Sequence, residues 1–320
     1  PLAEAVVRLT LALPPSGPQT SELTTALLAV MTQLQTGRNW TAAAEQARQT
    51  QTILRQSEAA LLLATPLTAQ GRARQSLSQL NITLAVLESA LTSQNFTATR
   101  TTWQESLWQL CALRLALLAD YQPPAPPQLY RTLPRLVGWR LVQVRTVRGD
   151  FTILLDGYSA PLGAGSFWQA VQSGAWREKV RLTDQGRVVR WSNPTRPIPL
   201  EIRPQTSRNI LYNPTTAPEP ALAFTPAGTV ALALPTNLKQ RPDEEQLAPS
   251  QLFIHRPPPT AAQARTLDGR FAVVGYVVAG LNDLNQLQDQ DRILEVTPLT
   301  CTRNNFEEGS LTCLLTGGAL

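Results

Sequence analysis

Two stretches near the C-terminal end of the chain decide its fold. The first reads Ser250-Gln251-Leu252-Phe253-Ile254, and the second reads Leu267-Asp268-Gly269-Arg270-Phe271-Ala272-Val273-Val274-Gly275-Tyr276-Val277. The first is a short, largely apolar run, and the second is a Leu-Asp-Gly turn that leads into a run rich in valine and aromatic residues. Both patterns are typical of β-strands that are entered from turns.

This pair of stretches resembles the C-terminal half of the cyclophilins, a family of barrel-shaped peptidyl-prolyl isomerases in which a Ser-Gln-Phe-Phe-Ile strand precedes such a turn. Residues 154–167 are similar to the family's strand, proline turn and first helix, and residues 228–233 to its central strand. Together with an expected helical region upstream, the chain resembles the large lumenal cyclophilin-like immunophilins of cyanobacteria and chloroplasts. In that group a bundle akin to the Q-type extrinsic subunit of photosystem II precedes the barrel.

The composition sets limits on the class of protein. A chain of 320 residues is long enough for two domains with cores of ordinary size. It contains no apolar run long enough to cross a membrane. The net charge of +5 comes from scattered residues, so we expect no nucleic-acid partner. The chain begins Pro1-Leu2 without methionine, from which we expect export after removal of a signal peptide.

Leucines recur at helical spacing through the N-terminal third, with breakers between the apolar stripes. The spacing predicts helices over 3–12, 20–36, 40–64, 67–92 and 97–120. The last four are long enough for an antiparallel bundle joined by short connections. We therefore assign residues 1–122 to a helical bundle.

A proline cluster at 123–127 ends the helical region, and we assign residues 123–135 to a proline-rich linker. Period-two alternation begins at about residue 137, and short strands continue with helices expected over 163–173 and 281–288. Residues 136–320 are therefore expected to form the second domain. The predicted fold class is multidomain α + β, an N-terminal antiparallel helical bundle followed by a cyclophilin-like closed β-barrel capped by two helices.

The resemblance implies an active site that has lost its usual residues. In cyclophilins an arginine donates a hydrogen bond to the prolyl nitrogen while the X-Pro bond twists, which stabilises the twisted state. That arginine falls on Thr183, or on Leu182 after a one-residue insertion, whereas Arg181 takes its place only after a further slip. The phenylalanine of the proline pocket falls on Arg187, and a glutamine falls on Arg190.

On the opposite wall of the implied groove, the family's tryptophan falls on Thr266 and its histidine on Phe271. Gln251 and Phe253 match the family pattern. They are either remnants of a groove that binds an extended peptide or strand residues that hold the barrel together. Because the donor is replaced, we predict a protein without isomerase activity, and an active isomerase that uses Arg181 or Arg187 stays open as the alternative.

The cysteines and the single histidine bear on cofactors. Cys301 and Cys313 bracket a polar loop, and in an oxidising compartment they form a candidate disulfide. His255 is the only histidine, so the four ligands of a zinc site are lacking, and we predict no metal and no cofactor.

The resemblance implies a role in the thylakoid lumen or the equivalent periplasm of a cyanobacterium. There the protein is expected to assist assembly, maintenance or stability of photosystem II. Its expected partners are photosystem subunits or their lumenal loops, with at most a peripheral association with the membrane and no small-molecule substrate. A permanent extrinsic subunit of a photosystem is a third hypothesis.

Overall fold

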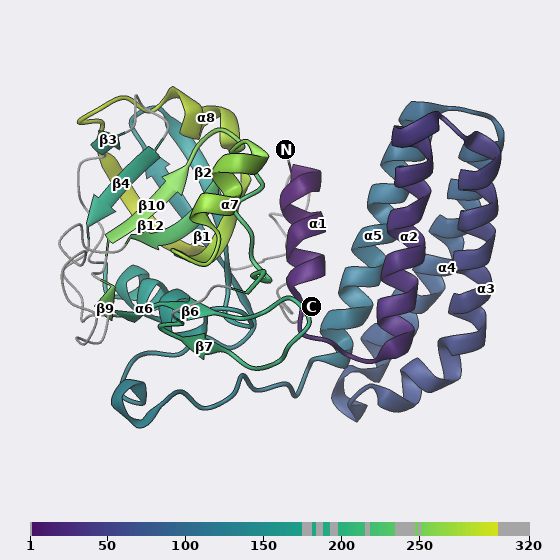
Figure 1. Ribbon diagram of the computed structural model, residues 1–320, viewed down its shortest axis with the longest axis horizontal. Helices are drawn as coiled ribbons and strands as arrows, with labels where there is room; N and C mark the ends of the chain where they lie inside the picture. Colours follow the sequence, from purple (N-terminus) through teal and green to yellow (C-terminus); the bar gives the residue numbers. More distant parts are fainter. Residues whose placement is uncertain are drawn as a thin grey trace. The chain divides into compact units, whose positions relative to one another are not determined.

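The computed structural model describes residues 2–174, 181–183, 188–192, 198–214, 218–233, 247–248 and 251–299 (Figure 1). At residues 2, 3, 6, 181–183, 188–192, 233, 247–248 and 251 the description covers the backbone alone. The chain divides into two compact units: Pro15–Tyr121, and a second unit that joins Pro1–Pro14 to Gln122–Leu320. Among the described residues, no helix combines the length and apolar character needed to cross a membrane.

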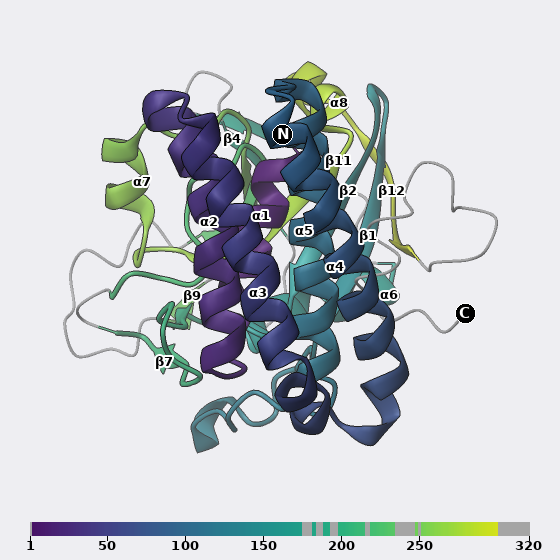
Figure 2. The ribbon, with the colours of Figure 1, turned by 90° about the vertical axis from the view of Figure 1, so that its right-hand side faces the viewer.

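The unit Pro15–Tyr121 is a helical bundle. It consists of α2 (Pro18–Gly37), α3 (Trp40–Ala64), the short 3-10 turn η1 (Leu67–Ala69), α4 (Gln70–Thr92) and α5 (Phe96–Leu117) (Figure 2). Each long helix packs against the next, and α5 also packs against α2. The leucine stripes face the interior, and the indole N–H of Trp103 donates to the Leu27 carbonyl at 2.8 Å. The predicted long helices are thus confirmed to within a few residues.

Asparagine caps explain where two of these helices begin. The side chains of Asn39 and Asn95 accept hydrogen bonds from the backbone N–H groups of Ala42 and Ala98, each at 3.0 Å. Such caps satisfy donors that have no partner inside the helix. Both sites carry an Asn-aromatic-Thr pattern, so the helix starts follow from local sequence.

The first helix, α1 (Leu2–Ala12), lies in the other unit and packs against the strand β11 (Ala272–Ala279). Its Ala5 and Leu9 side chains are buried. This division differs from the predicted boundaries, which placed residues 1–122 in one bundle. The physical reason is a tertiary contact, because the buried Arg203 donates a hydrogen bond to the Ala12 carbonyl at the end of α1.

The barrel unit contains one large antiparallel sheet with the strand order β12-β1-β2-β11-β8-β10-β4-β3. Its strands, in chain order, are β1 (Trp139–Thr146), β2 (Gly149–Asp156), β3 (Arg181–Thr183), β4 (Val188–Ser192), β8 (Thr229–Ala233), β10 (Gln251–His255), β11 and β12 (Ile293–Leu299). Two small ladders pair β5 (Ile198–Pro199) with β9 (Leu247–Ala248) and β6 (Glu201–Ile202) with β7 (Leu211–Tyr212). The predicted arrangement of a helical region followed by a curled sheet is confirmed.

The predicted closure of the barrel is not found in the described strands. Strands β12 and β3 are the two edges of the sheet, with no ladder described between them. Alternating side chains of the curled sheet nevertheless enclose one apolar core, to which β1, β2, β8, β10, β11 and β12 all contribute. Residues outside this sheet, among them Leu133 and Leu162, complete the core.

Two helices close the ends of this core. α6 (Pro161–Gln172) contributes Leu162 and Phe167, and α8 (Leu281–Gln286) contributes Leu284. They confirm the helices expected over 163–173 and 281–288. A third helix, α7 (Ala261–Leu267), was not predicted, although its capping box between Thr260 and Gln263 is a recognisable sequence signal.

A buried carboxylate holds the start of α6. The Glu201 side chain on β6 accepts hydrogen bonds from the backbone N–H groups of Leu162 at 3.1 Å and Gly163 at 2.7 Å. Burial raises the pKa of Glu201 to about 8, although these two hydrogen bonds act in the opposite direction. Glu201 therefore links the small β6–β7 ladder to the helix that closes the core.

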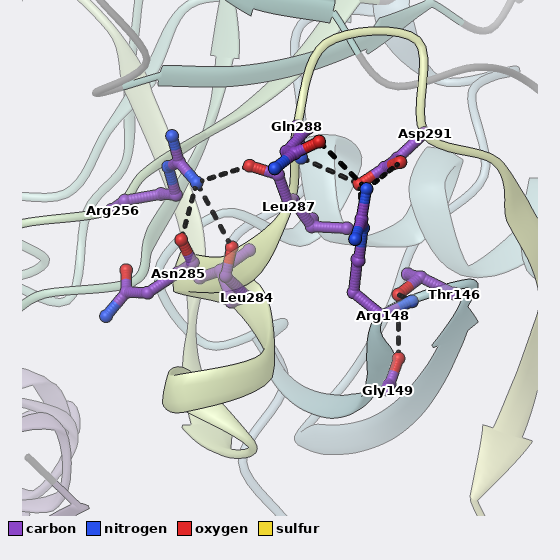
Figure 3. Close-up of polar contacts among 9 residues, drawn as sticks. All are labelled: Thr146, Arg148, Gly149, Arg256, Leu284, Asn285, Leu287, Gln288 and Asp291. Atoms are coloured by element: carbon purple, nitrogen blue, oxygen red, sulfur yellow. Dashed lines mark hydrogen bonds and ion pairs between the residues drawn. The ribbon is translucent and has the colours of Figure 1, made fainter.

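Two arginines fix the turn around α8 (Figure 3). Arg256 donates to the carbonyls of Asn285 and Leu287 at 3.0 and 2.9 Å, and so caps the C-terminal end of α8. Arg148 donates to the Asp291 carboxylate at 2.9 Å, which joins the β1–β2 hairpin to the segment before β12. The hydrogen bond from Arg148 lowers the pKa of Asp291.

The proline-rich segment belongs to the barrel unit. Arg135 donates to the Pro123 carbonyl at 2.8 Å, and the short 3-10 turn η2 (Gln128–Tyr130) follows the proline cluster. The end of the segment runs against α6, since a Cβ atom added at Gly165 would lie only 2.5 Å from the Pro134 carbonyl oxygen. Residues 123–135 therefore pack along the barrel unit.

Candidate active site

The candidate site lies on the face of the sheet that points away from the apolar core. Leu252 and Ile254 of β10 belong to the core, so Phe253 between them faces the opposite way. In the ladders, Phe253 pairs with Ala231 of β8 on one side and with Arg190 of β4 on the other. Directly opposed residues of an antiparallel pair share a face, so this row continues the face of Phe253 across the sheet.

The same row reaches Arg181, because Arg181 of β3 pairs with Arg190 of β4. The resemblance placed the family's donor arginine on Thr183, which pairs instead with Val188, two register positions away. Leu182 lies between them and so belongs to the other face. The register thus brings the backbone of Arg181, Arg190 and Phe253 into one row.

Three phenylalanine rings form a cluster on this face. The ring of Phe253 lies 6.0 Å from the stacked ring of Phe224 and 5.3 Å from the edge-on ring of Phe271, and the rings of Phe224 and Phe271 are 6.1 Å apart. Phe253 is 4% exposed and Phe224 is 0% exposed. We call Phe224, Phe253 and Phe271 the phenylalanine cluster.

Two hydrogen bonds place Phe224 over Phe253. The backbone N–H of Phe224 donates to the Asp268 carboxylate at 2.8 Å, and the hydroxyl of Tyr276 donates to the Ala223 carbonyl at 2.9 Å. Asp268 comes from the Leu-Asp-Gly turn and Tyr276 from β11. The sequence stretch that identified the fold therefore also anchors the segment that carries Phe224.

The polar groups behind the cluster are shielded from water. Burial raises the pKa of Asp268 and of Tyr276, and the positive charge of Arg8 on α1 acts against both shifts. Arg8 is therefore electrostatically coupled to the two residues that hold the segment of Phe224. This coupling makes α1 part of the surroundings of the candidate site.

The remaining residues singled out from the sequence lie in different places. Thr266 is an exposed residue of α7 whose hydroxyl donates to the Gln263 carbonyl of the same helix at 2.7 Å. Phe271 joins the phenylalanine cluster, as does Phe253. The backbone of Gln251 pairs with Ser192 and Ala233 at the start of β10. Arg187, Cys301 and Cys313 lie outside the described residues.

Sequence reasoning missed Phe224. It stands just before a Thr-Pro-Ala-Gly turn that leads into β8, and the turn itself is readable in the sequence. Its position over Phe253 depends on two long-range hydrogen bonds, one between Phe224 and Asp268, 44 positions apart, and one between Ala223 and Tyr276, 53 positions apart.

In the described part of the chain, no group of three histidine, cysteine, aspartate or glutamate side chains is arranged to hold a metal ion.

Comparison with known proteins identifies the barrel. The family model described as "Cyclophilin type peptidyl-prolyl cis-trans isomerase/CLD" matches residues 141–302, about half of the chain. Among solved structures, a cyclophilin of Cryptosporidium parvum matches with a TM-score of 0.37 and 15% identity, over 51% of this chain and 99% of that one. Cyclophilin AquaCyp293 of Hirschia baltica matches with a TM-score of 0.34 and 14% identity, over 50% of this chain and 76% of that one.

Three curated relatives resemble the chain more broadly. The sll0408 protein of Synechocystis sp. PCC 6803, whose name describes a thylakoid lumen peptidyl-prolyl cis-trans isomerase, is 27% identical over 92% of this chain and 81% of its own length. The chloroplastic isomerases CYP37 and CYP38 of Arabidopsis thaliana are 29% and 27% identical over 52% and 58% of this chain. The chain spans 41% and 48% of the lengths of these two plant proteins. By the match over residues 141–302, the chain belongs to the cyclophilin-type peptidyl-prolyl cis-trans isomerase family.

Proposed function

We propose that this protein is a lumenal or periplasmic cyclophilin that docks protein segments and assists assembly or maintenance of photosystem II, without appreciable isomerase turnover. The lumenal and chloroplastic names of its relatives support the compartment. The combination of a helical bundle with a cyclophilin sheet supports a role that depends on protein contacts. Photosystem subunits or their lumenal loops are the partners that this compartment offers.

One observation carries the catalytic part of the proposal: Phe271 stands where the family has a histidine and packs edge-on against Phe253 at 5.3 Å. Unlike histidine, a phenylalanine ring has no N–H that donates a hydrogen bond and no nitrogen lone pair that accepts one. Phe253, which the resemblance places as a remnant of the peptide groove, is only 4% exposed. Catalysis requires a pocket for the proline ring and a donor placed against its nitrogen.

A protease-coupled assay with a proline-containing peptide tests this part. We expect the wild-type protein to leave the rate of isomerisation at its uncatalysed value. The double variant Phe224→Ala with Phe271→His restores space and a polar group, and we expect it to bind the peptide more tightly than wild type does. Turnover by the wild-type protein at rates typical of cyclophilins would refute the proposal.

The role in photosystem II is tested in a cyanobacterial strain that lacks the gene. We expect assembly intermediates to accumulate and the wild-type gene to reverse this. The protein itself should migrate with assembly intermediates. Its recovery at one copy per mature, active photosystem would favour a permanent extrinsic subunit instead.

A second candidate function is residual isomerase activity, and the sheet register favours it. The backbone of Arg181 lies in the row that contains Arg190 and Phe253, so Arg181 is the candidate donor if a bound proline lies against Phe253. If wild-type turnover is found, Arg181→Ala should abolish it and Arg181→Lys should retain part of it. The control is Arg265→Ala, because Arg265 is an exposed residue of α7.

A further inference from the structure

Two leucines at one end of the bundle are almost fully exposed. Leu63 is 87% exposed near the end of α3, and Leu67 is 86% exposed at the start of η1. The next most exposed large apolar side chain among the described residues, Leu129, is 57% exposed. We call residues 62–67, which include the end of α3, the two connecting residues and the start of η1, the bundle tip.

The backbone of the bundle tip is ordered by its own hydrogen bonds. The hydroxyl of Thr65 donates to the Leu61 carbonyl at 2.7 Å, and the side-chain amide of Gln70 donates to the Leu62 carbonyl at 3.4 Å. Pro66 restricts the backbone further, and its carbonyl accepts from the N–H of Ala69 at 2.9 Å. Leu63 and Leu67 are therefore presented from a preformed turn, which lowers the entropy lost when a partner covers them.

The charged residues that follow the bundle tip in the chain are positive. Arg72 and Arg74, in the first turns of α4, are exposed, and neither forms an ion pair with another described residue. No aspartate or glutamate occurs between Glu58 and Glu88. The bundle tip and the start of α4 thus combine protruding leucines with two exposed arginines, a combination that matches an anionic lipid surface.

The size of the apolar patch favours a lipid surface over a protein partner. Two leucines on a turn expose no more than a few hundred Å2, whereas a stable protein interface covers about 800 Å2 on each partner. A few apolar side chains are enough for peripheral binding when basic residues add electrostatic attraction to acidic head groups.

We propose that the bundle tip is a peripheral membrane anchor, in which Leu63 and Leu67 enter the interface of an anionic lipid bilayer and Arg72 and Arg74 contact its head groups. This proposal concerns the bundle alone and holds whether or not the barrel is catalytic. The binding is reversible. The two leucines bury far less apolar area than a membrane-spanning helix does, and the two arginines add only electrostatic attraction to the head groups.

Co-sedimentation of the full chain with vesicles tests the proposal. We expect binding to vesicles of phosphatidylcholine mixed with phosphatidylglycerol, weaker binding to phosphatidylcholine alone, and weakening by salt because exposed charges are screened. The double variant Leu63→Ser with Leu67→Ser should lower the partition coefficient at least about tenfold, since each leucine contributes apolar burial. Arg72→Gln with Arg74→Gln should remove most of the salt dependence.

The matched control is Ile82→Ser with Val86→Ser, which removes two half-exposed apolar side chains of α4 outside the bundle tip. This control should bind vesicles as the wild type does, and all variants should keep the wild-type melting temperature. Equal vesicle binding by wild type and the Leu63/Leu67 variant would overturn the proposal. Failure of the wild type to bind anionic vesicles would also overturn it. If, in that case, the Leu63/Leu67 variant no longer co-migrated with the photosystem, the bundle tip would instead bind a protein partner.

Discussion

The guanidinium of Arg203 donates a hydrogen bond to the backbone carbonyl of Ala12, which lies 191 positions earlier in the chain. It also donates to the Ser159 hydroxyl at 3.0 Å and to the Ser207 carbonyl at 2.8 Å. The nearby Asp156 carboxylate is buried, and the charge of Arg203 opposes the rise that burial causes in the pKa of Asp156. One buried arginine thus ties the end of α1 to the barrel and balances a buried acid.

Arg203→Met should destabilise the barrel unit strongly. Removing the guanidinium takes away the positive charge that acts on the buried Asp156, and it also removes the hydrogen bond to the Ala12 carbonyl. Loss of one member of a buried charge pair costs about 3–5 kcal/mol. Chemical denaturation, followed by a signal from the barrel, measures the loss.

Two further variants separate the charge effect from packing. Arg265→Met, on the exposed face of α7, should change stability by no more than about 0.5 kcal/mol. Adding Asp156→Asn to Arg203→Met should recover part of the lost stability, because the two groups are electrostatically coupled. A strictly additive double variant would contradict the proposed charge balance.

Deletion of residues 1–14 should destabilise the barrel unit and leave the bundle intact, because α1 packs against β11. The deletion uncovers a strand whose residues 272–278 are all buried. Hydrogen exchange should become faster in β11 and stay unchanged in α2 to α5. Faster exchange in the bundle with an unchanged barrel would show that α1 supports the other unit.

The stability of the protein should fall as the pH rises from about 5 to about 8, in part because of Glu201. The folded-state pKa of this carboxyl is raised to about 8 by burial, above its ordinary value of 4.5. The folded state therefore holds a proton in this window that the unfolded state releases, and stability decreases with pH. Melting temperatures measured across the window should show a smaller decrease for Glu201→Gln than for wild type, and equal slopes would refute the assignment.

Gly275→Ala should prevent stable folding of the barrel. A Cβ atom at this position would lie 1.9 Å from the Leu154 carbonyl oxygen, on a strand that is already paired on both sides. The matched substitution is Gly71→Ala in α4, where no atom outside the neighbouring backbone of the helix lies within 4 Å of the added Cβ. That variant should be neutral or stabilised by up to about 1 kcal/mol. Thermal unfolding distinguishes the two, and a well-folded Gly275→Ala barrel would contradict the close approach of the strands.

Local signals made the helices of the bundle readable. Leucine stripes depend on residues three or four positions apart, and the interior of α2 to α5 follows them. The strand around Phe253 and the turn at Asp268 were readable for the same reason. Closure of the barrel was predicted but is not found in the described strands, because it would need hydrogen bonds between the edge strands β12 and β3, and no pattern within a strand reports on such long-range pairing.

By itself, then, the sequence determined the type and order of the elements and the family of the barrel, because hydrophobic periodicity and turn chemistry act over a few residues. Only the tertiary structure decided that α1 joins the barrel, that Phe224 covers Phe253, and that Arg181 shares a row with Arg190. Each of these relationships depends on a distant partner or on strand register. A shift of one residue in register moves a side chain to the other face of a sheet without changing the local pattern.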